Sequence, residues 1–106
     1  MTIEKGARIA WRPEALDDLE NVRAIIEHDN PLAAAETVLT ILDAVDRLAD
    51  QPSLGRPGRV PRTRELIVVD TPYVVPYRVK DGVVEVLRVF HGARRWPSRI
   101  ARRRRK

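Results

Sequence analysis

Apolar side chains recur at helical intervals in the stretch of chain that precedes Pro52. They are separated by four, three, four and three residues, and they comprise Ala34, Val38, Ile41, Val45 and Leu48. This spacing places them on one face of an α-helix, which must be buried against another element. Asn30 can cap the start of this helix, and Pro31 fits its first position, where no backbone N–H is needed. The chain must therefore fold around an amphipathic helix that ends before Pro52.

A second helix is predicted immediately upstream. Pro13 suits a first helical position, and Glu14 suits the positive end of the helix dipole. One face of this helix carries the apolar side chains of Ala15, Leu16, Leu19, Val22 and Ile26. The helix should end near His28 or Asp29. The link to the next helix is so short that the two are expected to form an antiparallel hairpin.

Segments with strand character lie on both sides of the two helices. A short strand is expected at Ala7–Trp11, before the first helix. Further strands are expected at Glu65–Val69, Tyr73–Val79 and Val83–Phe90. Asp81-Gly82 is typical of a hairpin turn. This order predicts an α+β fold: a strand, an antiparallel helix hairpin, then a three-stranded antiparallel meander, with the helices covering one face of a small antiparallel sheet.

The segment Tyr73–Val79 alternates well but contains a proline. Its odd-numbered side chains should point to one side of the sheet, and the even-numbered ones, Val74, Pro76 and Arg78, to the other. Proline has no N–H to donate, so it is rarely found inside a central strand. We therefore expect a β-bulge or an unpaired donor position at Pro76.

Charge is divided sharply between the two halves of the chain. Residues 1–51 carry five basic and eleven acidic side chains, whereas residues 52–106 carry fifteen basic and four acidic ones. Nearly all of these later cations are arginines, whose planar guanidinium suits phosphate and carboxylate groups. This asymmetry indicates a polyanionic or acidic partner for the second half. The sheet face away from the helices is expected to be open and basic.

Several kinds of functional site are absent from the sequence. It contains no cysteine and only two histidines, His28 and His91, in different elements, so no metal site is predicted. No helix follows the stretch Gly55–Arg59, which is therefore not a phosphate-binding loop, and no cofactor is expected. No stretch is long and apolar enough to span a membrane. Met1–Gly6 lacks the apolar core of a signal peptide, so a cytoplasmic location is expected.

The chain length of 106 residues suits one domain. We expect a single domain at residues 1–97 and a basic, mobile tail at residues 98–106. The run Arg102–Lys106 would attract any nucleic acid non-specifically and with strong salt dependence, although such a run is usually a solvated tail.

Arginine, tyrosine and one histidine are the side chains left to carry a function. His91 ends the last predicted strand, and imidazole transfers protons near neutral pH. A histidine bonded to a backbone group at a strand end is an equally good interpretation. Arg62 and Arg64 lie two residues apart, so they would share one face of a strand. A phosphate-binding surface would further include Arg56, Arg59, Arg78, Arg88, Arg94 and Arg95. For any single arginine, an ion pair with a nearby carboxylate or plain exposure is the simpler alternative.

Three motifs, in order along the chain, resemble the RelE/ParE superfamily of type II toxin–antitoxin toxins. They are Thr63-Arg64-Glu65-Leu66, the segment from Tyr73 to Val79, and the segment from Val86 to Pro97 with its Leu-Arg-Val-Phe-His stretch. The resemblance covers roughly residues 7–97. It implies the α+β fold above and a cognate antitoxin that wraps the toxin and forms a hetero-oligomer with it. RelE-like members cleave messenger RNA in the ribosome, whereas ParE-like members inhibit DNA gyrase.

The resemblance to the ParE-like branch is the stronger one. RelE-like nucleases have basic side chains on the strand that matches Glu65 and Ile67, and an arginine at the position of Val74. His91 matches the ParE-like branch without a gap. The resemblance therefore favours inhibition of DNA gyrase. The alternative is a metal-independent, ribosome-dependent endoribonuclease with His91 and Arg64 as catalytic residues. A second alternative is a non-toxic nucleic-acid-binding module.

Overall fold

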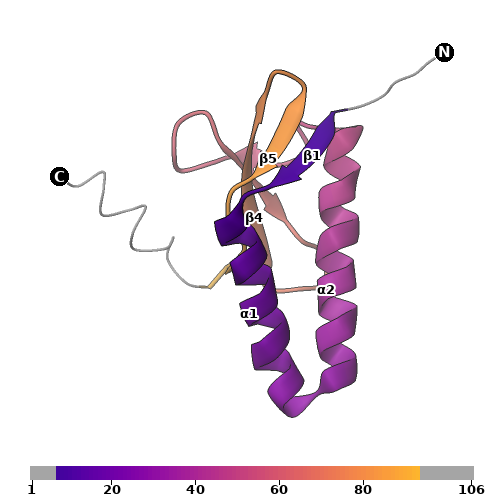
Figure 1. Cartoon of the computed structure of the whole chain (residues 1–106). Coiled ribbons are helices and arrows are strands. Elements are labelled where there is room, and N and C mark those ends of the chain that lie inside the picture. The colour runs from indigo at the N-terminus through magenta and orange to yellow at the C-terminus, as the bar shows by residue number, and fades with distance from the viewer. Residues whose placement is uncertain (1–6, 94–106) are drawn as a thin grey trace.

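Two helices form the expected antiparallel hairpin in the computed structural model, which describes residues 7–93 (Figure 1). They are α1 (Pro13–Asp29) and α2 (Pro31–Asp46), and a short 3₁₀ helix, η1 (Arg47–Ala49), follows directly. The side-chain oxygen of Asn30 accepts a hydrogen bond from the Ala33 N–H at 3.0 Å and so caps α2. Both predicted helices and the cap between them are therefore confirmed.

The strands form one mixed sheet that packs against the helix pair (Figure 1). In chain order they are β1 (Arg8–Trp11), β2 (Arg56–Pro57), β3 (Arg64–Ile67), β4 (Tyr73–Lys80), β5 (Val83–Val86) and β6 (Phe90–His91). Their order in space is β1-β5-β4-β3-β2, and β6 also pairs with β4. The predicted α+β fold and its antiparallel meander are confirmed. The sheet as a whole is not antiparallel, because β1 lies parallel to β5. The long chain between these two strands allows the crossover that parallel pairing needs.

The start of the meander differs from the prediction at Arg62. This residue lies before β3 in a turn where the Thr63 N–H donates to the Val60 carbonyl at 3.2 Å. The φ angle of Arg62 is 67°, in the left-handed region, so its backbone is not extended. The expectation that Arg62 and Arg64 share one face of a strand is therefore wrong.

The β-bulge expected at Pro76 is present, on the neighbouring strand. β4 pairs Tyr77 with Val86 but Val74 with Phe90, so the three residues 87–89 face only two residues of β4. The Pro76 carbonyl accepts a hydrogen bond from the Leu87 N–H at 2.9 Å. The donorless nitrogen of Pro76 faces the same neighbour, because the N–H and C=O of one strand residue point the same way. The bulge therefore divides the predicted last strand into β5 and β6.

The core lies between the helix pair and one face of the sheet. Its completely buried side chains include Ile41, Val45, Leu48, Val75, Tyr77, Val84 and Val86. The predicted alternation holds, since Val75 and Tyr77 both belong to this core. The opposite face is not open along its whole length, however, because Val74, Pro76 and Glu65 are also buried. That face is exposed at Arg78 and Lys80, near the β4–β5 hairpin, and also at Arg56 and Ile67, which pair with Glu65 and Val74.

Candidate functional site

Cations gather on the sheet face that points away from the helices. In β4, and from β1 to the residue that follows it, they alternate with side chains of the core face, and two more come from β2 and the loop after it. The members of this basic face are Arg8, Arg12, Arg56, Arg59, Arg78 and Lys80. Two carboxylates, Glu65 and Glu85, lie among them in the same rows of the sheet. The face is therefore basic, but its arginines are not isolated charges.

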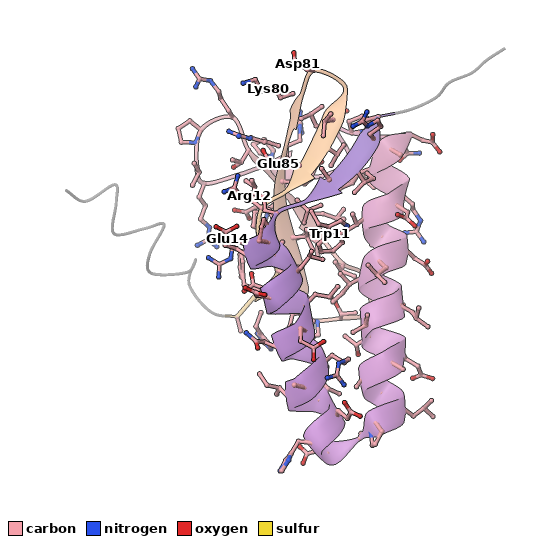
Figure 2. The ribbon with its side chains drawn as sticks, viewed as in Figure 1. Trp11, Arg12, Glu14, Lys80, Asp81 and Glu85 are labelled. Carbon is pink, nitrogen blue, oxygen red and sulfur yellow. The ribbon has the colours of Figure 1, made fainter. Side chains whose placement is uncertain are left out.

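Glu85 joins two arginines from distant parts of the chain. Its carboxylate accepts a hydrogen bond from Arg78 Nε at 2.6 Å and another from Arg12 Nη1 at 3.1 Å. Arg12 and Glu85 approach each other where β1 meets α1, and Lys80 lies at the tip of the neighbouring hairpin (Figure 2). The hydrogen bond from Arg78 is the main reason that the pKa of Glu85 lies below its usual value. Glu85 in turn raises the pKa of Arg12, so both groups remain charged at neutral pH.

Glu65 organises a second pair of arginines around a buried carboxylate. Only 1% of the Glu65 side chain is exposed, whereas Arg56 and Arg59 are about half exposed. Arg56 Nη2 donates to Glu65 Oε1 at 2.9 Å, and the Arg59 backbone N–H donates to Oε2 at 3.3 Å. Because each carboxylate fixes guanidinium groups that still reach solvent, the face offers oriented donors to an anionic or acidic partner.

The other predicted arginines lie apart from the basic face. Arg64 sits opposite Tyr77 and donates to the Gly55 carbonyl at 2.7 Å. Arg88 faces α1, where Asp18 binds it. Arg62 is exposed in the turn before β3. Arg94 and Arg95, and the predicted tail at 98–106, lie outside the described residues.

His91 ends β6 opposite Tyr73, whose ring it meets edge-on at 5.6 Å between centroids. Its Nδ1 accepts a hydrogen bond from the Ala93 N–H at 3.1 Å. A hydrogen bond to a backbone group was one of the two interpretations of His91 in the sequence, beside proton transfer. Arg64 and His91 pair with Tyr77 and Tyr73, four positions apart along β4, which corresponds to roughly 14 Å. The structure therefore does not bring the two candidate catalytic side chains together.

Arg8, Arg12, Lys80 and Glu85 were not among the predicted site residues. Alternation in the first strand gave a weak signal for Arg8, since Ile9 and Trp11 face the core. No local sequence pattern indicated that β1 pairs in parallel with β5, the pairing that brings Arg12 to Glu85.

Metal and membrane sites receive no support from residues 7–93. Within that range, no group of three or more His, Asp or Glu side chains is close enough to hold a metal ion. None of the helices in the same range is both long and apolar enough to cross a bilayer.

Comparison with known proteins agrees with this architecture. A family model described as the ParE toxin of the type II toxin–antitoxin system parDE matches residues 9–96. Y4kP of Sinorhizobium fredii is 49% identical over 91 residues, which are 86% of this chain and 94% of that protein. Toxin RelE2 of Caulobacter vibrioides is 42% identical over 88 residues, which are 83% of this chain and 98% of that protein.

Solved structures share the fold. A chain of the chromosomal ParDE system from P. aeruginosa aligns with a TM-score of 0.75 and 27% identity, over 80% of this chain and 95% of that one. A chain of the RelBE2 toxin–antitoxin complex from Mycobacterium tuberculosis aligns with a TM-score of 0.61 and 20% identity, over 82% of this chain and 99% of that one. The helix hairpin, the mixed sheet and the family match lead to one conclusion: this chain belongs to the ParE toxin family of type II toxin–antitoxin systems, within the RelE/ParE superfamily.

Proposed function

We propose that this toxin arrests bacterial growth by inhibiting DNA gyrase, and that a cognate antitoxin holds it inactive in a hetero-oligomer. The structural neighbours come from a ParDE system and from a RelBE2 toxin–antitoxin complex, which supports an antitoxin partner. The basic face supports a target surface that is anionic or acidic. Its arginines are oriented by Glu65 and Glu85, an arrangement suited to binding.

The separation of Arg64 and His91 is the observation that carries the choice of target. Cleavage of RNA by general acid–base catalysis needs proton-transferring groups within hydrogen-bond reach of one phosphodiester. Here Arg64 and His91 pair with positions of β4 that lie roughly 14 Å apart, and their side chains hydrogen-bond to the backbone groups of Gly55 and Ala93. This placement favours a toxin that binds its target over one that cleaves RNA.

Ribosome-dependent cleavage of messenger RNA is the second candidate. It is favoured by the relative named Toxin RelE2, which is 42% identical to this chain. On this alternative, His91 acts as the proton-transferring group and Arg64 contacts the phosphate.

Induced expression in a bacterial host separates these functions. Gyrase inhibition predicts growth arrest and an induced SOS reporter with intact messenger RNA, and purified protein should inhibit supercoiling by gyrase. Codon-periodic cuts inside translated messages, without SOS induction, would establish the nuclease instead. A soluble, folded product that leaves growth unaffected and binds nucleic acid only at low salt, without sequence preference, would favour the non-toxic binding module.

A further inference from the structure

The basic face extends across the sheet from one edge strand to the other. Arg8 lies on β1 and Arg56 on β2, while Arg78 and Lys80 lie on β4 between them. The two edge strands are separated by four strand spacings, which correspond to roughly 19 Å. A single anionic group cannot contact cations spread over this width. A polyanion with closely spaced charges can, and a DNA duplex carries about one phosphate per 1.7 Å of its axis.

The guanidinium groups of this face are held in place but still reach solvent. Arg56 holds Glu65 with Nε at 3.3 Å and Nη2 at 2.9 Å, which lie on one edge of its guanidinium. Arg78 donates to Glu85 through Nε. The side chains of Arg56, Arg59 and Arg78 remain 55%, 51% and 45% exposed. Because these donors are already oriented, a phosphate would gain charge-assisted hydrogen bonds with little further loss of side-chain entropy.

The composition of the basic face suits DNA better than an acidic protein. Between the cations of β1 and β4 lie Ala10, Val83 and Glu85, so this part of the sheet offers no aromatic anchor. Protein interfaces usually depend on aromatic or apolar anchors and have few charges at their centre. The helices α1 and α2, by contrast, carry nine acidic side chains and one arginine, which would repel phosphates. DNA would therefore approach the sheet side and not the helix layer (Figure 1).

We propose that the basic face binds the phosphate backbone of double-stranded DNA. This inference deepens the proposed function and rests on it in one respect, because the DNA is taken to be the duplex on which gyrase acts. Since the contacts are to phosphates, binding should be independent of base sequence and should weaken as the salt concentration rises. Binding to this duplex would bring the toxin next to gyrase.

Fluorescence anisotropy with a short DNA duplex, recorded over a series of salt concentrations, tests the inference. The full chain is compared with Arg78→Gln with Lys80→Gln on the basic face, and with Arg23→Gln with Arg47→Gln on the helix layer. Each double variant lacks two positive charges, and all three proteins keep the same arginine-rich C-terminal sequence. A difference between them therefore reports the surface that was changed. Circular dichroism confirms that each variant is folded.

The basic-face variant should bind DNA roughly 10- to 60-fold more weakly than the wild type at about 0.1 M salt, because the loss of two phosphate contacts reduces the slope of log K against log salt concentration by about 1.8. The affinities of these two proteins should converge as the salt concentration approaches about 1 M. The helix-layer variant should keep the slope of the wild type. Equal slopes for the wild type and the basic-face variant would overturn the inference.

Two further probes address other partners. A polyglutamate peptide and a single-stranded RNA, each matched to the duplex in total charge, should bind the wild type less tightly than DNA does, because both carry their charge at lower density. Tighter binding of either probe would overturn the choice of DNA.

A supercoiling assay keeps the proposed function separate from this inference. If DNA binding depends on the basic face but gyrase remains active, the proposed function fails and the DNA-binding surface stands. Equal inhibition of gyrase by the wild type and the basic-face variant would instead overturn the link between this surface and gyrase.

Discussion

Asp18 on α1 holds Arg88 with two hydrogen bonds, from Nε at 2.7 Å and from Nη2 at 3.1 Å. The same carboxylate accepts a third hydrogen bond from the Val89 N–H at 2.9 Å. Arg88 and Val89 lie in the bulge opposite Pro76, where the regular ladder is interrupted. Asp18 therefore ties the irregular end of the sheet to the helix layer. Its hydrogen bond is also the main reason that the pKa of Arg88 is raised.

Replacing Asp18 with alanine should lower the free energy of unfolding by about 2–3 kcal/mol, because it leaves a largely buried guanidinium and a backbone donor without their acceptor. Urea denaturation followed by circular dichroism measures the change. Asp17→Ala is the matched control, since Asp17 is an exposed neighbour on the same helix. Equal stability of the two variants would show that the carboxylate does not hold the bulge.

Replacing Tyr77 with phenylalanine should lower the free energy of unfolding by about 1–3 kcal/mol. The Tyr77 hydroxyl donates to the Pro52 carbonyl at 2.6 Å and accepts from the Gly55 N–H at 2.8 Å, so its loss leaves buried polar groups unsatisfied. Burial raises the pKa of this hydroxyl, which therefore remains a donor at neutral pH. Thermal unfolding beside Tyr73→Phe, a half-buried tyrosine on the same strand, tests the prediction. Indistinguishable melting temperatures would contradict it.

Gly55 has no room for a side chain. A Cβ at this position would lie 2.7 Å from Tyr77 Cε1 and 2.9 Å from the Glu65 backbone carbonyl oxygen. Gly55→Ala should therefore destabilise the protein by about 1–3 kcal/mol, the usual cost of overpacking. Gly82→Ala would meet no atom within 4 Å but has a φ of +76°, so it isolates the effect of backbone strain. A Gly55→Ala protein as stable as the wild type would mean that the loop moves freely away from β4.

Acid should weaken the contribution of Glu85. Its pKa is lower in the folded protein than in the unfolded chain, so its stabilisation is present above the unfolded value, near 4.3, and is lost as the pH falls through the folded value. The wild type should thus be more stable than Glu85→Gln at pH 7, and the difference should shrink between about pH 5 and pH 3. Unfolding in urea at each pH provides the comparison. A difference that stayed constant would exclude the carboxylate charge as its source.

Neutralising part of the basic face should reduce toxicity without unfolding the protein. Arg78→Gln with Lys80→Gln removes two exposed cations, and two charge-assisted contacts correspond to roughly a 100-fold loss of target affinity. Arg23→Gln with Arg47→Gln removes the same charge from the helix layer and should leave growth arrest unchanged. Toxicity is read as the amount of induced protein that halves the growth rate. A greater loss of toxicity in the helix-layer variant would indicate that the target binds the helix layer and not the sheet.

Local signals were enough to predict both helices and the first strand and meander of this fold, but not β2 or the division of the last strand. Helical spacing, the helix boundary at Asn30-Pro31 and the Asp81-Gly82 turn each depend on a few neighbouring residues. They can therefore be recognised in the sequence without knowledge of the tertiary packing. The bulge at Pro76 was predictable for the same reason, because the missing donor belongs to one residue. The turn at Arg62 was missed because an arginine occupies the left-handed position, where glycine or asparagine would have indicated a turn.

The sequence by itself determined that the chain forms an acidic helix pair and a basic sheet half, because periodicity and charge are properties of the chain alone. Only the tertiary structure decided which arginines act together. Arg12 meets Glu85 across 73 positions of sequence, and Arg88 meets Asp18 across 70. These pairings depend on which strands become neighbours when the core is buried, and burial depends on the whole apolar surface rather than on any local motif.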